Sequence, residues 1–202
     1  MGSAAYTWWQ LAADPAAAPT YIMGGLIGGL VLAMITIFKP MLAPWTAPLY
    51  AAVEGLALGA LSMVMNAAYA GLPMMAVTLT FGVFVAMLAL YAFRVIRVTQ
   101  RVRSVIMAAV LGVLLFYVLD MILGFFGVRV PGLHEGGMLG IGISLLTAGV
   151  AAFSLLLDFD MIERASEAGA PKRLEWYGAF GLIVTLVWLY IELLNLLRKL
   201  RD

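Results

Sequence analysis

Long apolar runs dominate the chain, and their lengths predict helices that cross a membrane. An α-helix needs about 17 to 25 predominantly apolar residues to span roughly 30 Å of hydrocarbon. Six runs reach this length, at Tyr21–Phe38, Ala47–Ala67, Leu72–Phe93, Val105–Phe126, Gly136–Leu157 and Trp176–Leu197. Charged residues, glycines and prolines separate them. The pattern therefore predicts an all-α polytopic membrane protein with six transmembrane helices.

A shorter apolar segment precedes these runs. Ala4–Ala13 carries Trp8 and Trp9, but its ten residues are too few to cross a bilayer. Tryptophan is enriched at the headgroup level, which fits either an interfacial helix or the shortened remnant of a first helix. We interpret residues 1–19 as this N-terminal segment, with the remnant favoured, and residues 20–202 as one transmembrane helical bundle.

Composition supports the membrane assignment and excludes several kinds of site. Of the 202 residues, 64% are hydrophobic and only 11% are charged, whereas a soluble domain is about half apolar. The chain has no cysteine and one histidine, so disulfides, thiolate sites and multi-histidine metal sites are excluded. Walker loops, Gly-x-Ser-x-Gly elbows and complete zinc-protease motifs are also missing. We expect neither an enzyme, a nucleic-acid-binding protein nor a resident cofactor.

Basic residues concentrate on one side of the predicted spans. If the spans alternate in direction, this side holds Lys39, Arg94, Arg97, Arg101, Arg103, Arg164, Lys172 and Arg173, and the opposite loops hold only Arg129. The positive-inside rule places the arginine-rich side in the cytoplasm. The charged stretch from Glu163 to Glu175 is interpreted as a solvated loop on that side. The basic C-terminus conflicts with this alternation, so its side stays open.

Two spans each carry a stripe of small and polar residues at helical spacing. The stripe on the fifth span consists of Gly137, Gly140, Ser144, Thr147, Ala151, Ser154 and Asp158, and that on the last span of Gly178, Gly181, Thr185, Trp188, Glu192 and Asn195. Residues three and four apart share one face of a helix. We therefore expect the two stripes to face one another inside the bundle.

Two acids on these stripes are the leading functional candidates. An ionisable side chain at membrane depth costs roughly 3 kcal/mol, which makes Asp158 and Glu192 site candidates by default. If they meet, the two carboxyl groups share a proton and titrate as a coupled pair. Their oxygens would suit Ca²⁺, so the pair would act as a pH-tuned cation gate. The alternative is that both acids are structural.

Other polar positions have weaker claims. Glu54 lies mid-span and is expected to face inward, in a pathway or a packing network. Asp160 faces away from Asp158 and is assigned to the cytoplasmic mouth. Pairs of glycines four apart occur at Gly24/Gly28, Gly25/Gly29, Gly55/Gly59 and Gly136/Gly140. Such pairs let helix backbones approach closely, and we interpret them as packing within the chain.

Several segments resemble one membrane-protein family. They are WYGAFGLIVTLVWLYIELLNLLRKL at the C-terminus, LLLDFDMIE before it, and GLIGGLVLAMITIFKP and APLYAAVEGLALGALS near the N-terminus. These segments are similar to the transmembrane Bax inhibitor motif family, and most closely to its bacterial Bax inhibitor-1-like branch. The resemblance implies seven helices, with six around a central C-terminal one. It also implies a shortened first helix in this chain.

The resemblance further implies residue roles. Asp158 matches the family's first acid and Glu192 the second, which is commonly aspartate, so the longer side chain changes the reach of the pair. Lys39 matches a basic residue that ends the second helix and serves as the counter-charge. Asn195, in the same motif as Glu192, is a further pathway candidate.

Three functions stay open at this point. The resemblance and the two acids favour a pH-sensitive, Ca²⁺-permeable leak channel of the bacterial cytoplasmic (inner) membrane, with Ca²⁺ as the permeant or bound ion. The alternative is a non-conducting membrane protein that modulates a membrane-bound protease or a stress or survival pathway. The third is an H⁺-coupled exchanger. We expect the lipid bilayer as the surrounding partner and favour a monomer.

Overall fold

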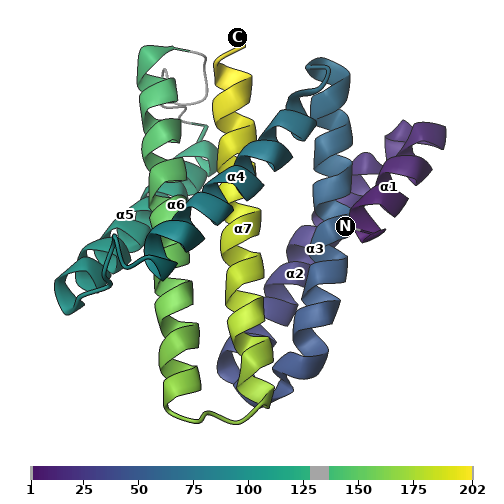
Figure 1. Cartoon of the computed structure of the whole chain (residues 1–202). Helices are drawn as coiled ribbons and strands as arrows, with labels where there is room; N and C mark the ends of the chain where they lie inside the picture. The colour runs from purple at the N-terminus through teal and green to yellow at the C-terminus, as the bar shows by residue number, and fades with distance from the viewer. Residues whose placement is uncertain (1, 128–136, 202) are drawn as a thin grey trace. The chain divides into compact units, whose positions relative to one another are not determined.

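The computed structural model describes residues 2–127 and 137–201, and these fold into helices alone. The elements are α1 (Gly2–Ala13), the 3-10 helix η1 (Pro15–Ala17), α2 (Ala18–Phe38), the 3-10 helix η2 (Pro40–Leu42), α3 (Ala43–Ala68), α4 (Leu72–Ala92), α5 (Gln100–Phe125), α6 (Met138–Glu167) and α7 (Arg173–Lys199) (Figure 1). The residues Gly136 and Arg129, used in the sequence predictions, lie outside the described ranges.

The predicted transmembrane helices are confirmed. Six helices in the described part of the chain are long and apolar enough to cross a membrane, and they correspond to the six apolar runs. The N-terminal segment forms α1, a helix of 12 residues that is too short to cross. An all-helical bundle is the expected outcome, because a backbone in hydrocarbon must satisfy its own hydrogen bonds.

The charged stretch after the fifth run is mostly helical, which corrects the prediction of a loop. α6 continues past Leu157 to Glu167, and Glu175 already belongs to α7. No glycine or proline interrupts the chain between Leu157 and Glu167, so nothing there stops the helix. The break comes at Gly169, whose φ of 64° is the left-handed conformation that commonly ends a helix. The charged side chains still point to solvent, as expected.

The chain forms two compact units. Unit 1 comprises Met1–Pro73 and Ile162–Ile183, and unit 2 comprises Met74–Met161 and Val184–Asp202. Both α6 and α7 therefore contribute to each unit, α6 mainly to unit 2.

Helices in unit 1 pack through glycines. In α2, a Cβ added at Gly25 would overlap the side chain of Ala57 in α3. In α3, a Cβ at Gly59 would lie only 2.5 Å from the carbonyl oxygen of Ala4 in α1. Without side chains at these positions the helices approach closely, which is how membrane helices associate. Gly25, Gly28, Gly29, Gly55 and Gly59 therefore serve packing within the chain, as predicted, whereas a Cβ at Gly24 would meet no atom within 4 Å. The Gly136/Gly140 pair stays a prediction, because Gly136 lies outside the described residues.

The turn between α2 and α3 is defined by local chemistry. α2 ends before Pro40, because the residue preceding a proline is driven out of the helical region, and Lys39 has φ −132° and ψ 72°. Across the turn, the hydroxyl of Thr36 donates to that of Thr46 over 2.7 Å. This bond ties the end of one helix to the start of the next.

Unit 2 contains the predicted polar stripe of α6. Five of its members are buried, namely Gly140, Ser144, Thr147, Ala151 and Ser154. Further along α6, Phe159 packs against Phe84 and Tyr91 of α4, with ring centroids 5.8 and 5.7 Å away. The small stripe lets the last part of α7 lie antiparallel to α6 within this unit, as the cross-helix bonds described below require.

Candidate functional site

The carboxyl group of Glu192 is buried in unit 2 and accepts three side-chain hydrogen bonds. Glu192 lies in α7 and is 3% exposed. The hydroxyl of Tyr117 donates to its Oε1 over 2.6 Å, and the indole Nε1 of Trp188 donates to the same oxygen over 3.0 Å. The hydroxyl of Thr147 donates to Oε2 over 2.7 Å. Three donors at these distances satisfy the hydrogen-bonding capacity of a buried carboxylate.

These donors come from three helices, which is why the site depends on the fold. Tyr117 is on α5 and Thr147 on α6, whereas Trp188 is four residues before Glu192 on α7. Only the Trp188 contact follows from sequence spacing, because residues four apart share a helix face. Sequence reasoning placed Trp188 on the correct stripe and Thr147 on the facing one. It gave no signal for Tyr117.

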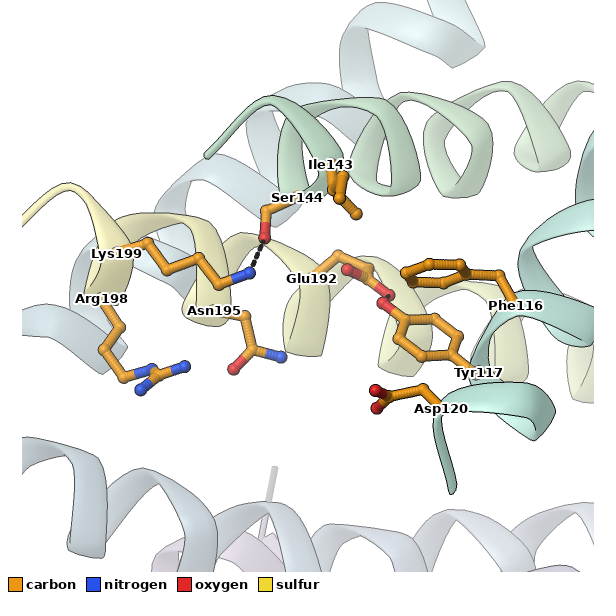
Figure 2. A pocket seen from close by; sticks show the side chains of 9 residues that line it. All are labelled: Phe116, Tyr117, Asp120, Ile143, Ser144, Glu192, Asn195, Arg198 and Lys199. Atoms are coloured by element: carbon orange, nitrogen blue, oxygen red, sulfur yellow. Dashed lines mark hydrogen bonds between the residues drawn. The ribbon is translucent and has the colours of Figure 1, made fainter. Parts of the chain in front are cut away.

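A polar cavity of about 190 Å³ adjoins this carboxyl group (Figure 2). Its lining residues are Phe116, Tyr117, Asp120, Ile143, Ser144, Glu192, Asn195, Arg198 and Lys199. The lining combines two acids, Asp120 and Glu192, with two cationic side chains, Arg198 and Lys199. The pathway candidate Asn195 lies on this wall, one turn beyond Glu192.

Lys199 points into unit 2. It is 7% exposed, and its ammonium group donates to Oγ of Ser144 over 2.9 Å and to the carbonyl oxygen of Gly140 over 3.2 Å. Figure 2 shows the Ser144 bond at the edge of the cavity. The sequence analysis left the side of the basic C-terminus open and gave Lys199 no role. A signal was available, because Lys199 is seven residues after Glu192 and therefore shares its helix face.

Asp158 occupies a second, separate polar position in unit 2. The side chain of Thr185, in α7, hydrogen-bonds to its carboxyl group. Its other oxygen, Oδ2, is buried and has no hydrogen-bond partner among the described residues. A buried carboxylate oxygen without a partner is unusual in a folded protein.

The structure does not bring Asp158 and Glu192 together as a pair. Because Asp158 pairs with Thr185 and Thr147 pairs with Glu192, the two acids mark different levels of the α6–α7 contact. Thr185 and Glu192 are seven residues apart, about 10 Å along a helix. Thr147 and Asp158 are eleven residues apart, about 16 Å. The shared proton expected from the sequence has no geometric basis at these separations.

Asp160 forms an ion pair that the sequence did not predict. Its Oδ2 lies 2.6 Å from a guanidinium nitrogen of Arg103, at the start of α5. The side chain of Asp160 is 9% exposed and that of Arg103 is 32% exposed. Arg103 had been interpreted only as part of the topology signal, and Asp160 as part of a cytoplasmic mouth. The pair instead joins the start of α5 to α6.

The remaining candidates lie in unit 1. Glu54 in α3 is half-buried, and its carboxyl group lies directly against Gly29 of α2 and near Tyr50. It faces the neighbouring helix, as predicted. Lys39, in contrast, is exposed, and it forms no ion pair with the described residues of its own unit. Its counter-charge role stays a prediction.

The arrangement around Glu192 does not fit a resident Ca²⁺ ion. Ca²⁺ takes six to eight oxygen ligands, several of them carboxylates. In the described part of the chain, no three His, Asp or Glu side chains group closely enough to hold a metal. The oxygens of Glu192 are already occupied by O–H and N–H donors, and two cationic side chains line the same cavity. We therefore treat Ca²⁺ as a candidate permeant ion only.

Comparison with known proteins places the whole chain in one family. The family model described as Bax inhibitor 1 like matches residues 1–202. The match includes α1 as well as the six longer helices. No curated protein and no solved structure matched the sequence.

Proposed function

The chain belongs to the Bax inhibitor 1-like family, and from this premise we propose that it is a pH-sensitive, Ca²⁺-permeable leak channel of the bacterial cytoplasmic membrane. In this proposal Glu192 is the proton sensor. The observation that carries the proposal is a buried carboxyl group, held by three donors, at the wall of a polar cavity in a membrane-spanning protein. Ionisable groups inside membrane proteins mark ion and proton pathways.

The hydroxyl of Thr147 lets Glu192 change its protonation state in place. Thr147 has one hydroxyl proton and two acceptors, Oε2 of Glu192 at 2.7 Å and the carbonyl oxygen of Ser144 at 3.1 Å. When Glu192 is ionised, this proton is donated to Oε2. When Glu192 is protonated, its own proton is donated to Thr147, whose hydroxyl turns to Ser144. The contact at Oε2 is kept in both states.

The charges around the cavity give the direction of the pH response. When Glu192 is ionised, it and Asp120 balance the charges of Arg198 and Lys199. When Glu192 is protonated, the same wall carries a net charge of about +1, which repels a divalent cation in a poorly solvated space. Ca²⁺ flux is therefore expected to rise as the pH increases and Glu192 ionises.

Reconstituted protein tests the proposal directly. Ca²⁺ entry into dye-loaded liposomes is measured at pH 6, 7 and 8 for the parent and for Glu192→Gln. We expect parental flux to increase across this series, and Glu192→Gln, which cannot titrate, to give a flux that does not change with pH. Glu175→Gln is the matched control, because Glu175 is exposed in the first turn of α7. It should behave as the parent does.

Two outcomes would contradict the proposal. A parental pH response that survives in Glu192→Gln would remove Glu192 as the sensor. Absence of flux above that of empty liposomes, from protein with a native circular dichroism spectrum, would remove the channel itself. That second result would favour a non-conducting protein that modulates a membrane protease or a stress pathway. A fixed exchange ratio between H⁺ and Ca²⁺ would instead identify an exchanger.

A further inference from the structure

An apolar groove runs between α5 and α6 in unit 2. Its outer part has a volume of about 450 Å³ and lies among Val105, Ile106 and Phe153. Its inner part, of about 310 Å³, lies among Gly112, Phe116 and Leu146 and ends at Thr147. Ala109 and Val150 line both parts, so the two form one continuous depression.

The groove is open along its length. The side chains at its rim are well exposed, with Val105 at 68% and Leu146 at 62%. A Cβ added at Gly112 would meet no atom within 4 Å, which shows that its floor is uncovered there. Along α5 the groove extends from Arg101 to Phe116, fifteen residues or about 22 Å. One leaflet contributes about half of the roughly 30 Å of hydrocarbon, so this length accommodates an acyl chain.

Two arginines, one lining the outer part of the groove and one adjoining it in the chain, have no partner among the described residues. Arg101 lines the groove itself, and Arg97 follows Ile96, another lining residue. Both guanidinium groups are exposed and form no hydrogen bond or ion pair with described residues. Their neighbours differ, since Arg103 is bound to Asp160 and Arg94 also has an interaction partner. The mouth of the groove therefore presents two positive charges that the described part of the chain leaves uncompensated.

We propose that this groove binds one anionic phospholipid. Its phosphate would be held by Arg97 and Arg101, and one acyl chain would lie along the groove toward Thr147. An apolar cleft of acyl-chain length with basic residues at one end matches an anionic lipid in both charge and shape, and basic pockets between transmembrane helices bind such headgroups. A zwitterionic lipid can place an acyl chain in the groove, but its headgroup has no net negative charge to neutralise the two arginines. The inference does not rest on channel activity.

Native mass spectrometry of the full-length protein in detergent micelles tests this. The protein is titrated with phosphatidylglycerol and, separately, with phosphatidylcholine of the same acyl chains. We expect phosphatidylglycerol to bind preferentially, and Arg97→Gln/Arg101→Gln to weaken its binding by about 30-fold. Lys172→Gln/Arg173→Gln removes the same charge from exposed positions in unit 1 and should leave binding unchanged.

A second pair of variants tests the groove independently of charge. Gly112→Leu fills the inner groove, whereas Gly82→Leu adds the same side chain to an open, exposed position of α4. We expect only Gly112→Leu to reduce phosphatidylglycerol binding. A large excess of inorganic phosphate should not displace the lipid, because phosphate lacks the acyl chain.

Several results would overturn the proposal. One is equal binding of phosphatidylglycerol and phosphatidylcholine by the parent. A second is equal phosphatidylglycerol binding by Arg97→Gln/Arg101→Gln and Lys172→Gln/Arg173→Gln. A third is equal phosphatidylglycerol binding by Gly112→Leu and Gly82→Leu. Displacement by phosphate would also overturn it, since it would reduce the site to an anion site at the two arginines. Far-ultraviolet circular dichroism confirms that each variant remains helical before the titration.

Discussion

The hydroxyl oxygen of Thr147 lies 2.7 Å from Oε2 of Glu192, across the contact between α6 and α7. The same hydroxyl lies 3.1 Å from the carbonyl oxygen of Ser144 in its own helix. One proton is thus placed between two acceptors. A buried carboxyl group keeps a hydrogen bond when its charge changes only if the partner can both donate and accept. A hydroxyl with a second acceptor meets this condition.

Thr147→Val should shift the pH response of Ca²⁺ flux to higher pH. Valine has a similar shape but cannot donate to Glu192, and a hydrogen bond to a charged group contributes about 1.5–3 kcal/mol. Losing it disfavours the ionised form of Glu192, so the Ca²⁺ flux should rise only at a higher pH than in the parent. Thr147→Ser keeps the hydroxyl and should stay close to the parent. Identical midpoints for the valine and serine variants would contradict the role of this hydroxyl.

Asp158→Asn and Glu192→Gln should act independently on stability. Their carboxyl groups lie at different levels and share no partner among the described residues. Mutations at distant sites without shared partners add within about 0.5 kcal/mol. Free energies of unfolding, from denaturant titration in micelles, are compared for both single variants and the double variant. A coupling energy above about 1 kcal/mol would restore the paired arrangement expected from the sequence.

Gly25→Leu should destabilise the protein, whereas Gly24→Leu should not. Added at Gly25, a Cβ overlaps Ala57 of α3, but at Gly24 it meets no atom within 4 Å. Overpacking of this kind costs about 1–3 kcal/mol, which lowers the melting temperature by about 5 °C in a chain of this size. Both variants gain the same helix propensity, so their difference isolates packing. Thermal unfolding in micelles, monitored by circular dichroism, measures the difference in melting temperature between the two variants. Equal melting temperatures would count against the α2–α3 contact.

Arg103→Gln should also lower stability. It leaves the buried carboxyl group of Asp160 without its arginine. Breaking a fully buried pair costs about 3–5 kcal/mol, and because Arg103 is about one-third exposed we expect about 1–3 kcal/mol. Arg173→Gln, at an exposed position, should change the free energy of unfolding by less than about 0.5 kcal/mol. If the two variants unfold alike in denaturant, the ion pair contributes nothing measurable.

The sequence by itself determined the membrane-spanning helices and the faces they bury. The length of an apolar run is a local property, and it alone decides whether a helix can cross the hydrocarbon. The stripe of small and polar residues in α6 was equally readable, because helical spacing places Ser144, Thr147 and Ser154 on one face. Family membership followed from local motifs for the same reason. The C-terminal extension of α6 and the start of α7 were missed, because charge was taken for a loop signal.

Tertiary structure alone decided which polar groups meet. Tyr117 is 75 residues from Glu192 in the chain, and no spacing rule connects them. The separation of Asp158 from Glu192 depends on the axial position of α6 relative to α7. A stripe of residues at helical spacing identifies the buried face of each helix but does not fix this axial position. Arg97 and Arg101, which have no partner among the described residues, likewise differ from Arg103 only because Asp160 lies beside Arg103 in the fold. Contacts between helices depend on their relative axial position, and the period of a single helix contains no information about it.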